Sequence, residues 1–427
     1  MTGLEAGAPA TAGMPATMSG AAKFVGQDRI YWRLLIRGAV LLMITFGIYR
    51  FWLTTDIRRF LWANTEIAGE SVEYTGTARE LLIGFLIAVA LLVPIYAAFF
   101  VAALDWGLFG KLSGLVGFLL LAVLGQFAVY RARRYRLSRT IYRGVHLHQT
   151  GSGWRYALYA LCWWVTIVAT IGLVYPWAQA TLERYKMRNT HYGNLSGEFA
   201  GLALSLFLRG FPMWLLIVAP LFLGLGASAF GIDWTALAEA AGHDGSDLAA
   251  RIESSNPGFD KAIVFAIMGC TWAGLAATML YPTFQALLLR WWVSGLRFDA
   301  VAARSRLRTG QVYRAYFRFL LYGGAFAVAV GLVAAAGLGL GRLLDGSLMT
   351  STTADIAMTA IFVIGYVAIA LGFSAIYQGT IKLSLWRLAV ESLELSGITA
   401  LEHVKATGKP SSALGEGLAD ALHVGGF

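Results

Sequence analysis

The chain has 427 residues, of which 58% are hydrophobic and 14% are charged, whereas soluble domains carry about 25% charged residues. This composition excludes an ordinary soluble protein and indicates a chain with several membrane-spanning helices. The net charge is +10, and the basic residues lie beside apolar segments rather than on one polar domain. That distribution favours contact with the lipid bilayer, through anionic headgroups on the cytoplasmic side, and argues against a nucleic-acid partner.

The predicted elements are apolar segments separated by basic ones. Residues 1–23 are rich in Ala, Gly and Thr and lack the apolar core of a signal peptide, so we predict a disordered N-terminal tail. A membrane domain is predicted over residues 24–381, with an acidic extracytoplasmic loop at 230–261. Residues 382–427 are predicted to form a cytoplasmic C-terminal tail, which opens as an amphipathic helix near 385–395. The apolar segments lie near 34–53, 81–103, 112–130, 154–177, 199–229, 262–284, 319–340 and 356–377.

A pattern of arginine, aromatic residue, threonine and glycine recurs along the chain as R-[FY]-x4-T-x3-[GN]-x6-G. A degraded fourth copy keeps the arginine and an aromatic residue but lacks the threonine and the glycines. In each copy we predict an interfacial helix followed by a small cytoplasmic β-hairpin. The predicted fold class is therefore an all-α polytopic membrane protein with internal repeats and small hairpins. The repeats are predicted near 34–103, 112–153 and 154–229, with the degraded copy near 262–340.

The number of membrane spans has two readings. Eight simple spans would break the positive-inside rule, since arginine-rich loops would then lie on both sides of the membrane. Two segments, 34–53 and 154–177, cause the conflict, and they occupy equivalent places in the repeat. The separation of Gly47 from Gly172 equals the separation of the first copy of the pattern from the third. We predict that both segments are short or re-entrant and return to the cytoplasmic side, which leaves six transmembrane helices. Eight transmembrane helices are the alternative.

Several short motifs follow one another in a fixed order. They are Gly47-Ile48-Tyr49 with Trp52, Arg58-Arg59-Phe60, Glu73-Tyr74 with Gly76, Arg139-Thr140 with Arg143-Gly144-Val145, Tyr175-Pro176-Trp177, and the ending Gly415-Glu416-Gly417-Leu418-Ala419-Asp420. Together they resemble the YjgN-type family of bacterial inner-membrane proteins of unknown function, over about residues 24–427. The chain departs from that family at Leu53-Thr54, where Ala-Lys is usual, and in the fourth repeat. The resemblance implies a multi-pass protein of the bacterial inner (plasma) membrane and brings no catalytic residues with it.

The arginine fixed in each copy is the candidate anion- or lipid-binding residue. A guanidinium group binds a phosphate or a carboxylate through paired hydrogen bonds. The alternative is that these arginines set the topology and anchor the interfacial helices among headgroups. The four candidates are Arg59, Arg134, Arg184 and Arg290.

The remaining polar residues of the repeat have simpler predicted roles. Thr65, Thr140 and Thr190 are predicted to end a helix through a side-chain bond to the backbone. His146 and His148 share one face of a predicted strand. They lack further ligands at a metal-binding spacing, so we predict neither a metal nor a cofactor.

Two functions fit these features. The first is a transporter or channel for a small solute, with an anion as the candidate, because duplicated membrane units and re-entrant segments are typical of transporters. The alternative is a membrane scaffold or lipid-organising protein with a basic cytoplasmic face. The sequence contains no catalytic motif in a suitable context, so an enzyme is not predicted.

Overall fold

The computed structural model describes residues 20–105, 107–241, 256, 258–343, 352–407 and 412–424. The protein is mostly helical (74%), and six helices of the described residues are long and apolar enough to cross a membrane. The predicted number of transmembrane helices agrees with these six candidate spans. They belong to α3 (Ala78–Asp105), α4 (Gly107–Ser138), α7 (Ala203–Gly231), α10 (Phe259–Gly295), α11 (Thr309–Leu343), and α12 (Thr352–Tyr377) with its continuation through η2 (Gln378–Lys382) and α13 (Leu383–Glu391).

Two pairs of shorter helices form hairpins. They are α1 (Asp28–Ile44) with α2 (Arg50–Ala63), and α5 (Gly153–Ala169) with α6 (Tyr175–Arg188). Helices α1 and α5 have 17 residues each, which gives a length of about 25 Å, too short for a typical span. Each is followed by a left-handed glycine, Gly47 (φ 87°) or Gly172 (φ 83°), at the turn into the next helix. Gly38 of α1 lies directly against Leu53 of α2, so the chain doubles back at this turn.

Eleven strands form one antiparallel sheet in the order β3-β2-β1-β11-β10-β9-β8-β7-β6-β5-β4. Strands β3 and β4 are parts of one extended segment, separated only by Val72. Its amide donates to Thr65 O on one side (3.0 Å), and the amide of Thr75 donates to Arg139 O on the other (2.9 Å). The chain itself thus joins the two ends of the sheet into a ring. The strands are β1 (Gly20–Phe24), β2 (Thr65–Ile67), β3 (Glu70–Ser71), β4 (Glu73–Tyr74), β5 (Thr140–Tyr142), β6 (Val145–Gln149), β7 (Thr190–Tyr192), β8 (Leu195–Phe199), β9 (Leu296–Phe298), β10 (Val301–Ser305) and β11 (Leu393–Ser396).

The ring shows what the sequence pattern did not predict. Each copy of the pattern has its two short strands, but the hairpins pair with one another instead of standing alone. An isolated two-stranded hairpin of this size is only marginally stable in water, so pairing with the neighbouring hairpins stabilises each of them. The fifth pair of strands, β11 with β1, comes from opposite ends of the chain.

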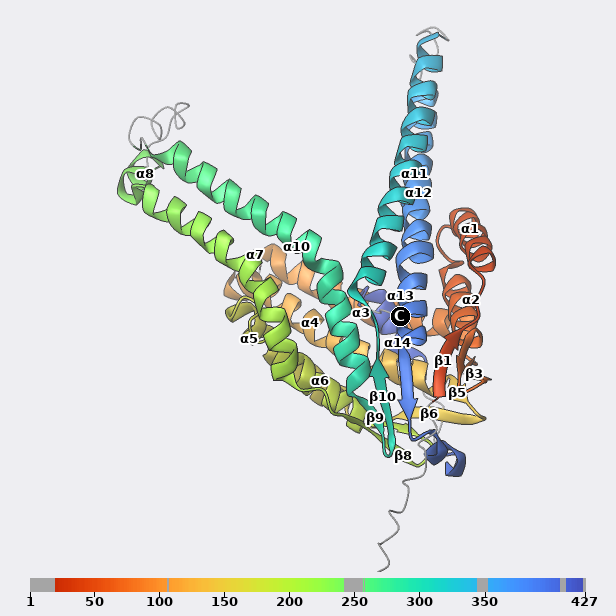
Figure 1. The fold of residues 1–427 in the computed structure, drawn as a ribbon. Coiled ribbons are helices and arrows are strands. Elements are labelled where there is room, and N and C mark those ends of the chain that lie inside the picture. The colour runs from red at the N-terminus through yellow and green to blue at the C-terminus, as the bar shows by residue number, and fades with distance from the viewer. Residues whose placement is uncertain are drawn as a thin grey trace, which may run out of the picture.

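The strands that flank the short helical hairpins are neighbours in the ring. Strand β1, before α1, pairs with β2, after α2, and strand β6, before α5, pairs with β7, after α6. Both hairpins therefore leave the ring and return to it. The long pairs α7–α10 and α11–α12 extend away from the strands in different directions, and α8 (Trp234–Ala241) lies at the far end of the first pair (Figure 1).

Residues near both ends of the chain take part in the sheet. Residues 20–24 form strand β1, so the predicted tail overlaps the sheet, and residues 1–19 lie outside the described residues. The C-terminal region continues α12 as a helix, contributes β11 to the sheet, and adds η3 (Ile398–His403) and α14 (Leu414–Ala421). Leu418 and Ala419 of α14 are buried against Ala88 of α3 and Ala128 of α4. Of the predicted acidic loop, residues 242–255 and 257 lie outside the described residues.

The repeat threonines end their helices as predicted. Each hydroxyl donates to the carbonyl oxygen four residues earlier, where the helix stops and the first strand of the hairpin begins. The distances are 2.7 Å for Thr65, 2.9 Å for Thr140 and 2.7 Å for Thr190. The local stop signal in the sequence is therefore a side-chain bond to a free carbonyl of the last turn.

Candidate functional site

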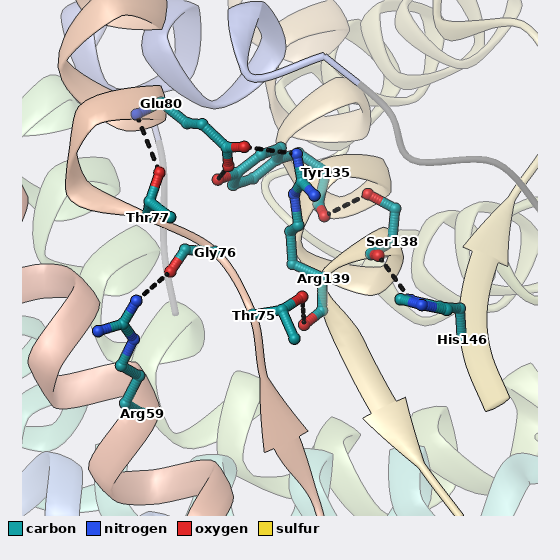
Figure 2. A network of polar contacts seen from close by, with 9 residues as sticks. All are labelled: Arg59, Thr75, Gly76, Thr77, Glu80, Tyr135, Ser138, Arg139 and His146. Atoms are coloured by element: carbon teal, nitrogen blue, oxygen red, sulfur yellow. Dashed lines mark hydrogen bonds and ion pairs between the residues drawn. The ribbon is translucent and has the colours of Figure 1, made fainter. Parts of the chain in front are cut away.

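Two of the predicted arginines hold the ends of their own hairpins. Arg59 donates to the carbonyl oxygen of Gly76 (3.0 Å), as Figure 2 shows, and Arg184 donates to that of Gly201 (3.1 Å). In both copies the arginine lies on the helix before the hairpin and the glycine lies just before the helix that follows. The arginine therefore links its own helix to the segment that leads into the next helix.

The other two predicted arginines depart from this arrangement. Arg290 donates to the hydroxyl of Thr309 at 3.4 Å, a weaker contact at the start of α11. Arg134 makes no hydrogen bond to any residue that the structure describes. The four arginines do not converge on one site, and three of them have a structural partner.

A fifth copy of the repeat, which the sequence pattern missed, makes the arginine contact for a third time. Arg387 of α13 donates to the carbonyl oxygen of Gly26 (3.2 Å), just before α1. It precedes β11 and the left-handed Gly397 by the spacing that separates Arg59 from β2 and Gly69. The copy is hard to find because its second strand comes from the N-terminus.

Neighbouring copies are also linked at the edge of the ring (Figure 2). Glu80 of α3 pairs with Arg139 at 2.7 Å and accepts a hydrogen bond from the hydroxyl of Tyr135 at 2.7 Å. The hydroxyl of Thr75 donates to the carbonyl oxygen of Arg139 (3.2 Å). These contacts connect the first hairpin to the end of α4 in the second copy.

In the first and third copies, the side chain one residue before the repeat arginine is buried. Arg58 and Glu183 have only 5% and 9% of their side chains exposed, whereas Arg59 and Arg184 are exposed. A helix turns by about 100° per residue, so adjacent residues face different surroundings. Arg133 is the corresponding residue of α4.

Three residues further along, the same inner faces carry two more cations. Arg136 lies on α4 and Lys186 lies on α6, with 15% and 18% of their side chains exposed. Spacing of three residues keeps side chains on one face of a helix. We call this set the basic cluster; it comprises Arg58, Arg133, Arg136, Lys186, Glu183 and Glu416.

One half of the basic cluster centres on Glu416 of α14. Its carboxylate forms an ion pair with Arg58, and its other oxygen lies 3.8 Å from Nε of Arg136. Arg58 also donates to the hydroxyl of Tyr74 at 3.2 Å. Burial lowers the pKa of Arg58, but Glu416 and Tyr74 raise it by more, so its charge is held firmly.

The other half centres on Glu183 of α6. Its carboxylate pairs with Lys186 and accepts a hydrogen bond from the indole nitrogen of Trp292 at 3.0 Å. Arg133 lies within electrostatic reach of Glu183 and donates to the hydroxyl of Thr190 at 3.3 Å. Burial lowers the pKa of Lys186, although Glu183 opposes that shift.

The charges of the basic cluster do not balance. Four cations share two carboxylates, and Arg136 lies within electrostatic reach of both Arg58 and Arg133. The set is therefore positive overall, and its guanidinium and ammonium groups have the chemistry to bind a small anion through charged hydrogen bonds.

A cavity of about 400 Å³ adjoins this cluster and includes Arg58 and Glu416 in its wall. It lies between α1, α2, α3, α14 and the end of α12, and Lys382 of the π-helix is also in its wall. Single turns of π-helix occur frequently at functional sites. The cavity thus shares Arg58 and Glu416 with the basic cluster.

Metal-ligand groupings are absent from the part of the chain that the structure describes, since no three His, Cys, Asp or Glu side chains gather there. His148 stacks on His191 of the neighbouring strand, with ring centroids 5.0 Å apart. The Nδ1 atom of His146 lies 3.3 Å from the carbonyl oxygen of Ser138, so His146 and His148 contact different partners.

Comparison with known proteins identifies the family of the chain. A search of curated proteins and a search of solved structures each found no match to the chain. The model of one family, described as bacterial protein of unknown function (DUF898), matches residues 19–421, in agreement with the YjgN-type resemblance. The six apolar helices indicate an integral, multi-pass membrane protein. With a match over nearly its whole length, the chain belongs to this bacterial DUF898 family.

Proposed function

We propose that this protein is an inner-membrane transporter for a small anionic solute, with the basic cluster as its anion-binding site. The observation that carries the proposal is that four buried or partly buried cations lie together with two carboxylates, next to helices able to cross a membrane. Binding sites of transporters lie at the junctions of repeated units. The basic cluster likewise lies at the junction of the first three copies, since α2, α4 and α6 each contribute side chains to it.

The proposed topology has six crossings, with the ring of strands on the cytoplasmic side. The α1–α2 and α5–α6 hairpins enter the membrane from that side and return to it, as the pairing of β1 with β2 and of β6 with β7 supports. The alternative of eight single crossings would put these paired strands on opposite sides. The arginine-rich segments lie beside the ring, whereas Asp233 and Glu239 lie at the end of the α7–α10 pair that is far from the ring. This distribution of charge agrees with the positive-inside rule.

Solute flux into proteoliposomes tests the proposed function, with chloride, sulfate, phosphate, acetate and succinate as the panel. We expect the wild-type protein to admit at least one of these anions. Arg133→Gln removes a cation of the basic cluster and is expected to lower that flux by about tenfold or more, since a charged hydrogen bond contributes roughly 1.5–3 kcal/mol.

The neighbouring substitution Arg134→Gln is the matched control, because it removes the same charge from a residue outside the cluster. We expect its flux to stay within about twofold of the wild type. Thermal unfolding of both variants verifies that they fold. A wild-type protein that admits none of the five anions, or an equal loss of flux in the two variants, contradicts the proposal.

A second function, organisation of anionic lipids, is favoured by one surface. Arg29, Arg33 and Arg37 are exposed on α1 at a spacing of four residues, which places them along one face. Such a stripe suits anionic headgroups, with about 1 kcal/mol for each basic residue near the surface.

Replacing all three arginines of α1 by glutamine tests this second function. We expect the variant to retain less phosphatidylglycerol and cardiolipin after purification, because it lacks the headgroup contacts, and to keep the wild-type anion flux. Lipid content is measured by mass spectrometry against phosphatidylethanolamine as the internal reference. An unchanged lipid content counts against a lipid-organising role of this face.

A further inference from the structure

The ring of strands has an apolar interior. Successive side chains of a strand point to opposite faces of a sheet. On β11, Leu393 and Leu395 face the interior, whereas Glu394 between them pairs with the exposed Arg306. A cavity of about 290 Å³ lies inside the ring, and β2, β5, β6, β7, β9, β10 and β11 all contribute to its wall. The cavity is therefore a product of the closed ring and is separate from the one beside the basic cluster.

The wall of this cavity contains polar side chains that are already bonded within the protein. The hydroxyl of Tyr142 donates to the carbonyl oxygen of Ile67 (2.9 Å), and the hydroxyl of Tyr192 donates to that of Tyr142 (3.0 Å). The hydroxyl of Thr140 donates to the backbone of α4 (2.9 Å) and accepts a hydrogen bond from the indole of Trp62 (3.0 Å). The other wall residues that the structure describes are aliphatic or phenylalanine. A ligand would therefore find no free donor among these side chains.

Side chains also lie at both ends of the ring. Where the helices enter it, Trp62 and Trp386 stack with their ring centroids 4.8 Å apart, and Trp386 donates to a threonine hydroxyl at the start of β2 (3.0 Å). At the end with the hairpin turns, η3 brings Leu401 into the wall of the cavity. The chain after η3 is held to the β7–β8 turn, because the amide of Lys405 donates to Oδ1 of Asn194 (3.0 Å).

The composition of the wall specifies the class of ligand. Protein interiors are close-packed and rarely contain a void larger than a water molecule, so an empty space of this volume is unfavourable. Water is a poor occupant, because a buried water needs about two to four polar partners. A charged group would lose its hydration without gaining a partner. An apolar cavity of about 150 Å³, roughly half this volume, stays dry and binds benzene.

We propose that the interior of the ring binds a neutral hydrocarbon group of about twice the size of benzene. A free apolar molecule and the end of an acyl chain of a bilayer lipid present the same chemistry to this wall. The proposal is independent of anion transport, because the basic cluster contributes no residue to the described wall of the cavity.

Photo-crosslinking with a diazirine-bearing octane tests this proposal, on the full-length protein in phosphatidylcholine nanodiscs. We expect saturable labelling of peptides that contain residues 296–303 and 393–401. Unlabelled octane is expected to remove the label. Ionised octanoate at the same concentration is expected to leave it, because the wall offers no partner to a carboxylate.

A second probe distinguishes the two sources of the hydrocarbon. It is a phosphatidylcholine with the diazirine at the end of one acyl chain. Labelling of the same peptides by this lipid supports the proposal with the bilayer as the source. Labelling by the octane probe alone supports it with a free molecule as the ligand.

Two phenylalanine substitutions on β10 locate the site. Ala303 lines the cavity, so Ala303→Phe fills the space and is expected to reduce labelling by about tenfold or more. Ala302 points to the opposite face of the strand and is not part of the wall, so Ala302→Phe is expected to label like the wild type. Leu401→Trp fills the cavity from η3, outside the strands, and is expected to reduce labelling as Ala303→Phe does. Thermal unfolding verifies that each variant folds.

Equal labelling of the two phenylalanine variants, equal competition by octane and octanoate, or no labelling by either probe overturns the hydrocarbon site. Labelling that appears only after removal of residues 1–19 also overturns it, because the chain itself would then occupy the cavity. A labelled ring in a protein without anion flux leaves this site in place and contradicts the proposed transport. Anion flux that depends on Arg133, with an unlabelled ring, has the opposite meaning.

Discussion

Glu416→Gln is expected to destabilise the protein by roughly 3–5 kcal/mol, because breaking a buried ion pair leaves its partner charged and uncompensated. The side chains of Arg58 and Glu416 are 5% and 8% exposed. Arg136, 3.8 Å from the same carboxylate, loses this interaction as well. The measurement is the midpoint of thermal or denaturant unfolding in one detergent.

A more exposed ion pair provides the control for Glu416. Glu80 pairs with Arg139, but 34% of its side chain is exposed, so Glu80→Gln is expected to cost about 1 kcal/mol or less. The double variant Arg58→Met with Glu416→Leu removes both buried charges and should recover much of the stability lost by Glu416→Gln. Equal effects of Glu416→Gln and Glu80→Gln would show that the Arg58 pair is not buried as described.

Gly417→Ala is expected to cause the second large loss, of about 3 kcal/mol, because overpacking a tight contact forces the backbone to move. A Cβ atom at Gly417 would overlap the carbonyl group of Gly84 and the amide of Phe85. Helix α14 thus lies with its backbone directly against α3, and the strain cannot be relieved by rotating a side chain.

The control for Gly417 is a glycine with open space around it. A Cβ atom at Gly114 of α4 meets nothing within 4 Å. Gly114→Ala is expected to raise stability by up to about 1 kcal/mol, because alanine favours the helix. Unfolding of both variants in the same detergent gives the comparison. A loss for Gly417→Ala no larger than a few tenths of a kcal/mol would contradict the close packing of α14.

Sequence patterns predicted the local structure well because the signals are local. The apolar segments identify the six long helices, and Thr65, Thr140 and Thr190 mark the ends of three helices. The ring of strands could not be predicted in this way. Its strands have two to five residues, too few for a period to appear, and the pair β1–β11 joins positions near the two ends of the chain.

The basic cluster was missed for a related reason. Residues that recur in the copies mark the positions on which the shared fold depends. Arg59 and Arg184 are examples, because each bonds to the end of its own hairpin. The position one residue earlier is arginine in the first two copies but a different residue in each of the others, so it produces no repeat through the chain. Its residues in chain order are Arg58, Arg133, Glu183, Leu289 and Trp386. Glu416, which completes the cluster, belongs to no copy of the pattern and reaches it only through the packing of α14.

All the strand pairs belong to one ring, which we propose lies on one side of the membrane, so that the short helical hairpins do not cross it. Asn194, exposed in the turn between β7 and β8, tests this claim directly. The background variant replaces Cys162 and Cys270, the two native cysteines, by serine. A cysteine at Asn194 is then labelled with an impermeant maleimide in intact cells and in inverted membrane vesicles.

The proposed arrangement predicts that this cysteine reacts in inverted vesicles and is protected in intact cells. A cysteine at Glu239 of α8, at the far end of the long helices, should show the reverse pattern and serves as the control. Reaction of the Asn194 cysteine in intact cells would place the turn after β7 outside the cytoplasm. This result would contradict a ring that lies wholly on the cytoplasmic side.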